Sequence, residues 1–282
     1  MGWHSYFGGT TLQDLSTNPD PPVLLEIEAG IATVTLNRPK SINALSEEML
    51  AALQETWDGL ATNRDVKVVI LRGAGDHFCA GHNLKEMTAR REDADGGHQY
   101  FNDLFSTCSK MMLSMVNLPQ PVIAEVTGIA TAAGCQLVAT CDLAVASDTA
   151  RFATSGVNIG LFCSTPMVAL SRAVPRKAAM EMLLLGEFVE AEKAAQYGLI
   201  NRVVPLDKVS DTTREMAENI VGKSPVAVKM GKGAFYQQAE MELAEAYEFA
   251  GRTMAENMMA RDAERGIGAF VTKKPMPEWT GE

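Results

Sequence analysis

The amino-acid sequence predicts an α/β protein in which a parallel sheet is followed by a helical C-terminal extension. Between residues 31 and 146, short segments rich in Val and Ile alternate with longer amphipathic segments. This is the order expected of parallel strands joined by helices. Over residues 165–272 the pattern is mainly helical, and only a short strand at 202–204 is expected to interrupt it. The 282 residues are 46% hydrophobic and 21% charged, which is typical of a globular protein with a substantial core.

The expected elements follow in order along the chain. Residues 31–37 form the first strand because Ile, Val and Thr favour strands, and Pro39 closes it. Ser46 is expected to cap a helix that runs to about Asn63, since a serine oxygen can accept a backbone N–H at a helix start. The elements expected next are strand 66–71, helix 98–117, strand 122–126, helix 132–140 and strand 143–146.

Charge and composition exclude several classes of protein. With 25 Lys and Arg against 35 Asp and Glu, the net charge of −10 argues against a nucleic-acid partner. No stretch approaches eighteen apolar residues, so no membrane partner is expected. Residues 1–22 lack the features of a signal peptide or a basic presequence, so we expect a flexible lead and a cytoplasmic location. The five cysteines have no metal-like spacing; we expect free thiols and no metal.

Two turns that follow buried strands place small residues at the start of a helix. The first covers residues 77–85 (HFCAGHNLK) and the second covers residues 127–136 (TGIATAAGCQ). Small residues let a ligand approach the backbone, and a helix start offers unpaired N–H donors. Two such donors aimed at one oxygen would stabilise the enolate of a thioester. Taken alone, each turn more often serves packing, so both interpretations stay open.

Four segments, in the same order along the chain, resemble the enoyl-CoA hydratase/isomerase superfamily, also called crotonases. They are residues 36–45 (LNRPKSINAL), 78–87 (FCAGHNLKEM), 134–142 (GCQLVATCD) and the tail 264–275. Residues 127–142 and 152–166 resemble more closely one subgroup, the enoyl-CoA hydratase domain-containing protein 3 type. The resemblance implies a crotonase-type spiral of ββα units with a C-terminal helical trimerisation region.

The resemblance also implies a domain layout and a partner. A flexible lead at 1–22 precedes an acyl-CoA-binding α/β core at 23–205 and a helical trimerisation region at 206–282. The implied partner is an acyl-CoA thioester, with no separate cofactor because coenzyme A is part of the substrate. The implied assembly is a homotrimer or a dimer of trimers.

Site residues are implied position by position. The backbone N–H groups of His82 and Ala133 match the donors of the family's oxyanion hole. Lys40 and Lys85 match basic residues near CoA, although without the resemblance either could be a solvated surface lysine. The positions that match CoA-binding residues are Lys40, Ala44, Ala80, Asn83, Leu84, Lys85, Phe270 and Lys273, the last two reaching the CoA of a neighbouring subunit.

The sequence departs from the hydratase pattern where water would be activated. Gln136 and Gly156 stand at the positions of the two hydratase glutamates. An amide has no accessible pKa and glycine has no side chain, so two-carboxylate hydration is excluded for these residues. The family glycines are also missing from residues 162–170, where Ser164 or Thr165 is expected to cap a helix that begins at Pro166.

Three side chains near these positions carry groups that can exchange protons, but none of them is expected to replace the glutamates. The His82 side chain is expected to point away from the thioester, and Glu125 and Asp142 are expected to be structural. In related naphthoate synthases a glycine at the second position makes room for bicarbonate, and Gly156 allows the same arrangement. Three hypotheses follow: an acyl-CoA enzyme working through an enolate, a non-catalytic acyl-CoA binder or regulatory subunit, and a generic anion-binding α/β domain. The acyl chain length cannot be read from the sequence.

Overall fold

The computed structural model describes residues 20–282 and confirms the predicted α/β class. In the larger sheet, β1 pairs antiparallel with β2, and the remaining pairs are parallel. In spatial order its strands are β1 (Val23–Glu28), β2 (Ile31–Leu36), β3 (Val68–Gly73), β4 (Val122–Val126), β6 (Leu143–Ser147) and β9 (Arg202–Val204). The smaller sheet consists of β5 (Ile129–Thr131), β7 (Arg151–Ala153) and β8 (Val189–Glu190). The chain spirals between the sheets, because β4 leads into β5 and β6 leads into β7.

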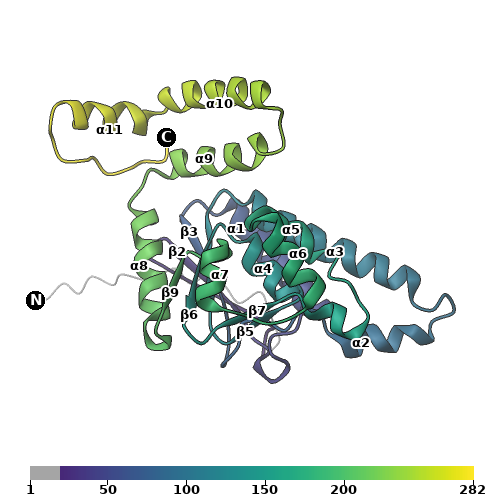
Figure 1. The fold of residues 1–282 in the computed structure, drawn as a ribbon. Helices are drawn as coiled ribbons and strands as arrows, with labels where there is room; N and C mark the ends of the chain where they lie inside the picture. Colours follow the sequence, from purple (N-terminus) through teal and green to yellow (C-terminus); the bar gives the residue numbers. More distant parts are fainter. Residues whose placement is uncertain (1–19) are drawn as a thin grey trace, which may run out of the picture.

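Helices cover both faces of the larger sheet (Figure 1). Side chains alternate across a strand, so Ile31, Ile70 and Ile123 pack on one face with Ala217 of α8 (Val209–Val221). The opposite face carries the main core, where strand side chains pack against α1, α3 and α4. The helices between the strands are α1 (Glu47–Thr62), α2 (Leu84–Ala89), α3 (His98–Asn117), α4 (Ala133–Thr140), α5 (Pro166–Ala173), α6 (Arg176–Leu185) and α7 (Ala191–Tyr197). Burial on both faces explains the continuous apolar run of β3.

Local signals at helix starts are only partly confirmed. The Ser46 hydroxyl accepts the Met49 N–H at 3.1 Å, as predicted for the start of α1. Helix α5 begins at Pro166, also as predicted. The expected side-chain cap of α5 is wrong, because Thr165 makes no such hydrogen bond and the Ser164 hydroxyl turns back to an earlier carbonyl. Proline alone therefore marks this helix start.

Several short elements are missing from the sequence-based prediction. These are β1, β5, β7, β8 and α2. The expectation that only one strand interrupts the helical C-terminal half is wrong, because β8 also does so by pairing with β7. A strand of two or three residues has too few positions to show a period of two, so it forms through pairing with a neighbour. The predicted lead at 1–22 lies almost wholly outside the described residues.

The last three helices project from the α/β body, at the top of Figure 1. They are α9 (Pro225–Gln238), α10 (Leu243–Met258) and α11 (Arg261–Val271). Helix α9 is anchored by Lys232, whose ammonium donates to the Asp142 carboxylate at 2.8 Å, and by the Tyr236 hydroxyl at 2.9 Å. The same carboxylate accepts the Val122 N–H at 2.7 Å, which confirms the structural role expected for Asp142. No helix in the described part of the chain is long and apolar enough to span a membrane.

All five cysteines are free thiols, as predicted, and four of them are fully buried. Burial raises the pKa of Cys79, Cys108 and Cys135 to about 12, and it also raises the pKa of Cys141 and Cys163. A protonated thiol is a poor nucleophile, so these side chains behave as small core residues.

Candidate functional site

The two glycine-containing turns lie directly against each other. Cys79 forms a parallel bridge with Ala130, and the Thr131 N–H donates to the Cys79 carbonyl at 3.0 Å. A Cβ atom at Gly81 would lie 3.2 Å from the Ala133 nitrogen, and one at Gly134 would lie 2.2 Å from the Cys79 oxygen. The glycines therefore permit this close approach, which makes His82 and Ala133 neighbours.

The backbone N–H groups of His82 and Ala133 have no hydrogen-bond acceptor among residues 20–282. On either side of His82 the backbone is paired with Leu45, which donates to the Gly81 carbonyl at 2.8 Å and accepts the Asn83 N–H at 3.2 Å. This fixes the His82 peptide while its own N–H stays free. Two fixed, unpaired donors on adjoining turns are suited to hold an oxygen that gains negative charge.

The second turn stores backbone strain at the residue before Ala133. Ala132 has φ +51° and ψ −119°, a region that residues other than glycine rarely adopt. Such a conformation costs on the order of 1–3 kcal/mol and persists only where surrounding contacts enforce it. Here the Ala132 N–H donates to the Ala153 carbonyl at 2.9 Å, and the Gln136 N–H donates to the Ala132 carbonyl at 3.0 Å. This backbone conformation places the Ala133 N–H at the first position of α4, where it has no acceptor within the helix.

The segment that carries Lys40 and Ala44 lies alongside the first turn. The Ala80 N–H donates to the Ile42 carbonyl at 2.9 Å, next to the Leu45–His82 bridge. The structure therefore brings Lys40 and Ala44 close to the predicted site residues 80–85. Ala44 and Ala80 are half-buried, while Lys40, Leu84 and Lys85 are exposed.

Asn43 and Arg38, which are not among the predicted site residues, hold this segment in place. The buried Asn43 amide donates to the carbonyls of Ala74, His77 and Phe78 at 2.9–3.1 Å, and its oxygen accepts the Arg38 N–H at 2.9 Å. Both residues belong to the segment 36–45, whose motif names them without revealing the carbonyls that they bind.

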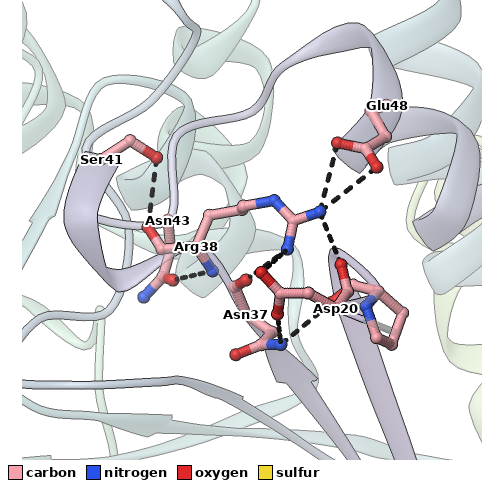
Figure 2. Close-up of polar contacts among 7 residues, drawn as sticks. Asp20, Asn37, Arg38, Ser41, Asn43 and Glu48 are labelled. Carbon is pink, nitrogen blue, oxygen red and sulfur yellow. Dashed lines mark hydrogen bonds and ion pairs between the residues drawn. The ribbon is translucent and has the colours of Figure 1, made fainter. Parts of the chain in front are cut away.

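Figure 2 shows how Arg38 extends this support outward. Its guanidinium donates to the Glu48 carboxylate at 3.2 Å and to the Asp20 carbonyl at 3.0 Å. Asn37 beside it donates to the Asp20 carboxylate at 3.2 Å. The turn that presents Lys40 is thereby tied to α1 and to the start of the sheet.

Other predicted CoA-binding positions have different surroundings. The Asn83 side chain caps α2, because its oxygen accepts the Lys85 N–H at 3.1 Å and its amide donates to Glu86 at 2.9 Å. Phe270 lies on α11, and Lys273 follows that helix. Figure 1 shows α11 and α2 on opposite sides of the molecule. Within one chain, Phe270 and Lys273 therefore do not join the other predicted residues.

The positions of the missing glutamates differ in available space. Gln136 lies in the first turn of α4 with its buried Oε1 unpaired. At Gly156, by contrast, a Cβ atom would lie 2.3 Å from the Leu161 carbonyl oxygen and 2.9 Å from the Cys163 sulfur. The expected room for bicarbonate is therefore absent where a side chain would begin. The chain itself fills that space, because the segment after Gly160 folds back over Gly156.

Glu125 belongs to a different part of the molecule. It alternates with Ala124 and Val126 of the main core, so it faces the side of the sheet covered by α8. Burial raises the pKa of the Glu125 carboxyl group, and nearby Arg72 partly opposes this. A cavity of about 340 Å³ lies at this edge and is lined by residues that include Arg72, Glu125 and Thr127. It meets the second turn only at Thr127, the first residue of that turn. The described residues contain no cluster of His, Cys, Asp and Glu able to hold a metal.

The family model described as Enoyl-CoA hydratase/isomerase matches residues 26–282. The chain belongs to the enoyl-CoA hydratase/isomerase family. Its structure resembles an enoyl-CoA hydratase of Mycobacterium smegmatis with a TM-score of 0.87, at 53% identity over 92% of this chain and 99% of that one. The crotonase-type fold expected from the sequence is thus confirmed.

Relatives of known sequence support the expected subgroup of the enoyl-CoA hydratase/isomerase family. Enoyl-CoA hydratase domain-containing protein 3, mitochondrial, of Xenopus laevis is 46% identical over 92% of this chain and 86% of its own length. The (E)-benzylidenesuccinyl-CoA hydratase of Thauera aromatica is 33% identical over 90% of this chain and 97% of its own length.

The expectation of a cytoplasmic location is wrong by these comparisons. The Xenopus relative is named as mitochondrial, and so are four further relatives, including those of Homo sapiens and Danio rerio. The five free thiols indicate only a compartment that keeps thiols reduced. They cannot distinguish the cytosol from a reducing organelle.

Proposed function

We propose that this member of the enoyl-CoA hydratase/isomerase family binds acyl-CoA thioesters and stabilises their enolates, without ordinary two-glutamate hydration. The observation that carries the proposal is the pair of unpaired N–H donors of His82 and Ala133 on adjoining turns. The names of relatives such as the benzylidenesuccinyl-CoA hydratase point to the same class of thioester substrate.

The chemistry follows from where charge develops. When a proton leaves the Cα atom of an acyl thioester, the electron pair moves toward the carbonyl and the oxygen becomes negative. Two N–H groups that are already fixed can hold this oxygen without reorganising. One such donor typically contributes on the order of 10²–10³ in rate. The strained Ala132 and the Leu45 bridge supply the rigidity that this role needs.

A non-catalytic acyl-CoA binder or regulatory subunit is the second candidate. It is favoured by Gln136 and Gly156, because no carboxylate stands where water would be activated. A pure binder, however, has no use for two rigid donors aimed at an enolate oxygen. The two candidates differ in whether bound thioesters lose their Cα proton.

Binding and hydration are tested together. We expect calorimetry to detect acyl-CoA binding that weakens with added salt, because exposed Lys40 and Lys85 would face phosphates. Replacing both by alanine should weaken binding by up to about 1 kcal/mol each, while Lys193→Ala on remote α7 should not. Absence of binding to any CoA ester at low salt would refute the proposal.

Hydration of crotonyl-CoA should be far slower than in an ordinary hydratase, because each missing acid–base group typically contributes about 10²–10⁴-fold. Gln136→Glu should raise the rate, since a carboxylate in the first turn of α4 is also favoured by the helix dipole. The rate at which the enoyl absorbance is lost measures hydration by the wild type and by the variant. Wild-type hydration at the speed of an ordinary hydratase would contradict this reading of Gln136 and Gly156.

A further inference from the structure

A second cavity, of about 380 Å³, lies at the carboxyl edge of the larger sheet, beyond the ends of β3, β4 and β6. It is lined by the loop 75–77, the segment 127–129, Thr149, Arg151 and Leu206. Ligands of open α/β sheets bind at this edge. None of the lining residues is among the predicted acyl-CoA-binding positions, so the cavity is available for a ligand of its own.

Arg151 brings a positive charge to this cavity that the chain leaves unneutralised. Its side chain is exposed and forms no ion pair or hydrogen bond with any residue of the range 20–282. Glu190 is its cross-strand neighbour on β8. The guanidinium lies instead over the Phe188 ring, 4.8 Å from the ring centre. Stacking orients the guanidinium plane and leaves its N–H groups free for a carboxylate.

Asp76 brings a negative charge that is also unpaired. This residue is exposed, and its carboxylate has no ion pair or hydrogen bond within the part of the chain that the structure describes. Arg151 and Asp76 thus line one cavity without neutralising each other. Each of the two charges is available to a ligand that reaches into the cavity.

The rest of the lining is uncharged at neutral pH or apolar. The His77 Nδ1 atom is buried against Gly128 without a partner, so we place the N–H of the neutral ring on its other nitrogen. Thr127 and Thr149 supply hydroxyl groups, and Ile129 and Leu206 supply apolar surface. The cavity can therefore contact a carbon chain as well as charged ends.

The adjoining cavity of about 340 Å³ does not offer the same unpaired charges. There, the Arg72 guanidinium donates to the Thr35 hydroxyl at 3.0 Å. Arg72 also favours the charged form of Glu125, against the effect of burial on the pKa of that carboxyl group. The cation and the carboxyl group of this cavity are therefore matched within the chain.

The two unpaired charges decide which class of ligand fits. A simple anion would be attracted by Arg151 and repelled by Asp76, and a simple cation would meet the reverse. A molecule with a carboxylate at one end and an ammonium at the other satisfies both. It also carries no net charge for the chain, at −10, to repel.

We propose that this cavity binds a small zwitterion of the amino-acid class. Its carboxylate accepts hydrogen bonds from Arg151, its ammonium donates to Asp76, and its carbon chain lies on Ile129 and Leu206. This site is independent of the proposed acyl-CoA site.

The probes are linear amino acids from glycine to 6-aminohexanoate, which differ in the distance between the two charges. Butyrate carries only the carboxylate and butylammonium carries only the ammonium. Saturation-transfer NMR titrations of the full-length protein measure each Kd. Arg151→Gln and Asp76→Asn each remove one charge. Arg172→Gln on α5 and Asp103→Asn on α3 are matched controls at exposed positions, and thermal melting checks that each variant is folded.

We expect one member of the series to bind at least about tenfold more tightly than butyrate or butylammonium, because it makes both charged contacts. Arg151→Gln should weaken that probe by at least about tenfold, and Arg151→Lys by less, since lysine keeps the charge. Asp76→Asn should remove the preference over butyrate, a change that a purely structural role of Asp76 would not give. The two control variants should bind like the wild type.

Equal binding of the amino acids and butyrate by the wild type would overturn the proposal, even if a variant fails to fold. So would a preferred probe that binds equally well after both charge substitutions, or the failure of every probe to bind at about 10 mM. Acyl-CoA binding is measured separately by calorimetry, so a failure of the proposed function would not be confused with a failure of this site.

Discussion

At the scale of single residues, the structure leaves no room for a side chain at Gly156. Gly156→Ala should destabilise the fold by about 1–3 kcal/mol or more, because the new methyl group would overlap the Leu161 carbonyl oxygen and the Cys163 sulfur. The matched control is Gly59→Ala at an exposed position of α1, where nothing lies within 4 Å of the new Cβ. It should stabilise the helix by roughly 0.5–1 kcal/mol. Urea unfolding measures both, and an unchanged midpoint for Gly156→Ala would contradict the structure.

The same crowding changes how a hydratase site could be rebuilt. Replacing both Gln136 and Gly156 by glutamate would supply the two missing carboxylates. At Gly156, however, the added side chain would have to displace the backbone at Leu161. We therefore expect Gln136→Glu to be the productive change, with Gly156→Glu losing stability before it gains any chemistry.

The sequence reveals which residues are present at the site but not how they are held. That Gln136 and Gly156 cannot act as acids or bases follows from their chemical identity. The fold-back of Leu161 over Gly156 and the three carbonyls bound by Asn43 depend on contacts between distant segments. The edge-on packing of the His82 ring against Phe105 of α3 is likewise a contact between distant segments that the motif at residues 78–87 does not reveal.

At the scale of elements, the attachment of α9 depends on one buried ion pair. The Lys232 and Asp142 side chains are only 6% and 17% exposed and lie 2.8 Å apart. Lys232→Met should cost about 3–5 kcal/mol, because it leaves the Asp142 carboxylate buried without its cation. Arg172→Met, in the exposed pair with Glu240, should cost less than about 1 kcal/mol. Equal effects on the urea midpoint would show that α9 is held by other contacts.

Predictability of the elements follows their length and burial. Helices α1 and α3 and the strands β3 and β4 show clear apolar patterns and lie near their predicted bounds. The three-residue strands β5 and β7 carry no pattern of their own and exist because they pair with each other. Strand β5 also carries Ala130, whose bridge with Cys79 brings the second turn against the first. The element that assembles the site is therefore one that the sequence does not reveal.

At the scale of the whole molecule, the projecting helices present an unusually apolar surface. Tyr247 and Met254 on α10 are 75% and 64% exposed, and Phe270 on α11 is 73% exposed. Large exposed apolar patches mark interaction surfaces. We propose that this region joins subunits into a trimer or a dimer of trimers, with closed rotational symmetry. Phe270 and Lys273 would then serve the CoA of a neighbouring subunit.

Light scattering at micromolar concentration should therefore find a trimer or hexamer. The double change Tyr247→Lys and Met254→Glu should shift the protein toward monomers, because charged groups would have to be buried at the interface. Acyl-CoA affinity should fall in parallel if the neighbour completes the site. A wild-type protein that is monomeric and binds CoA esters fully would contradict this assembly.

The buried, protonated thiols can be used to follow local opening of the folded protein. A thiol-directed label reacts with the thiolate, and burial keeps Cys79, Cys108, Cys135 and Cys163 in the unreactive form while the core is closed. Labelling of the native protein would thus proceed only as fast as segments open. Cys79 and Cys135 would report on the two turns. Mass spectrometry of the labelled peptides would then give the order in which these regions open, with no cysteine introduced by mutation.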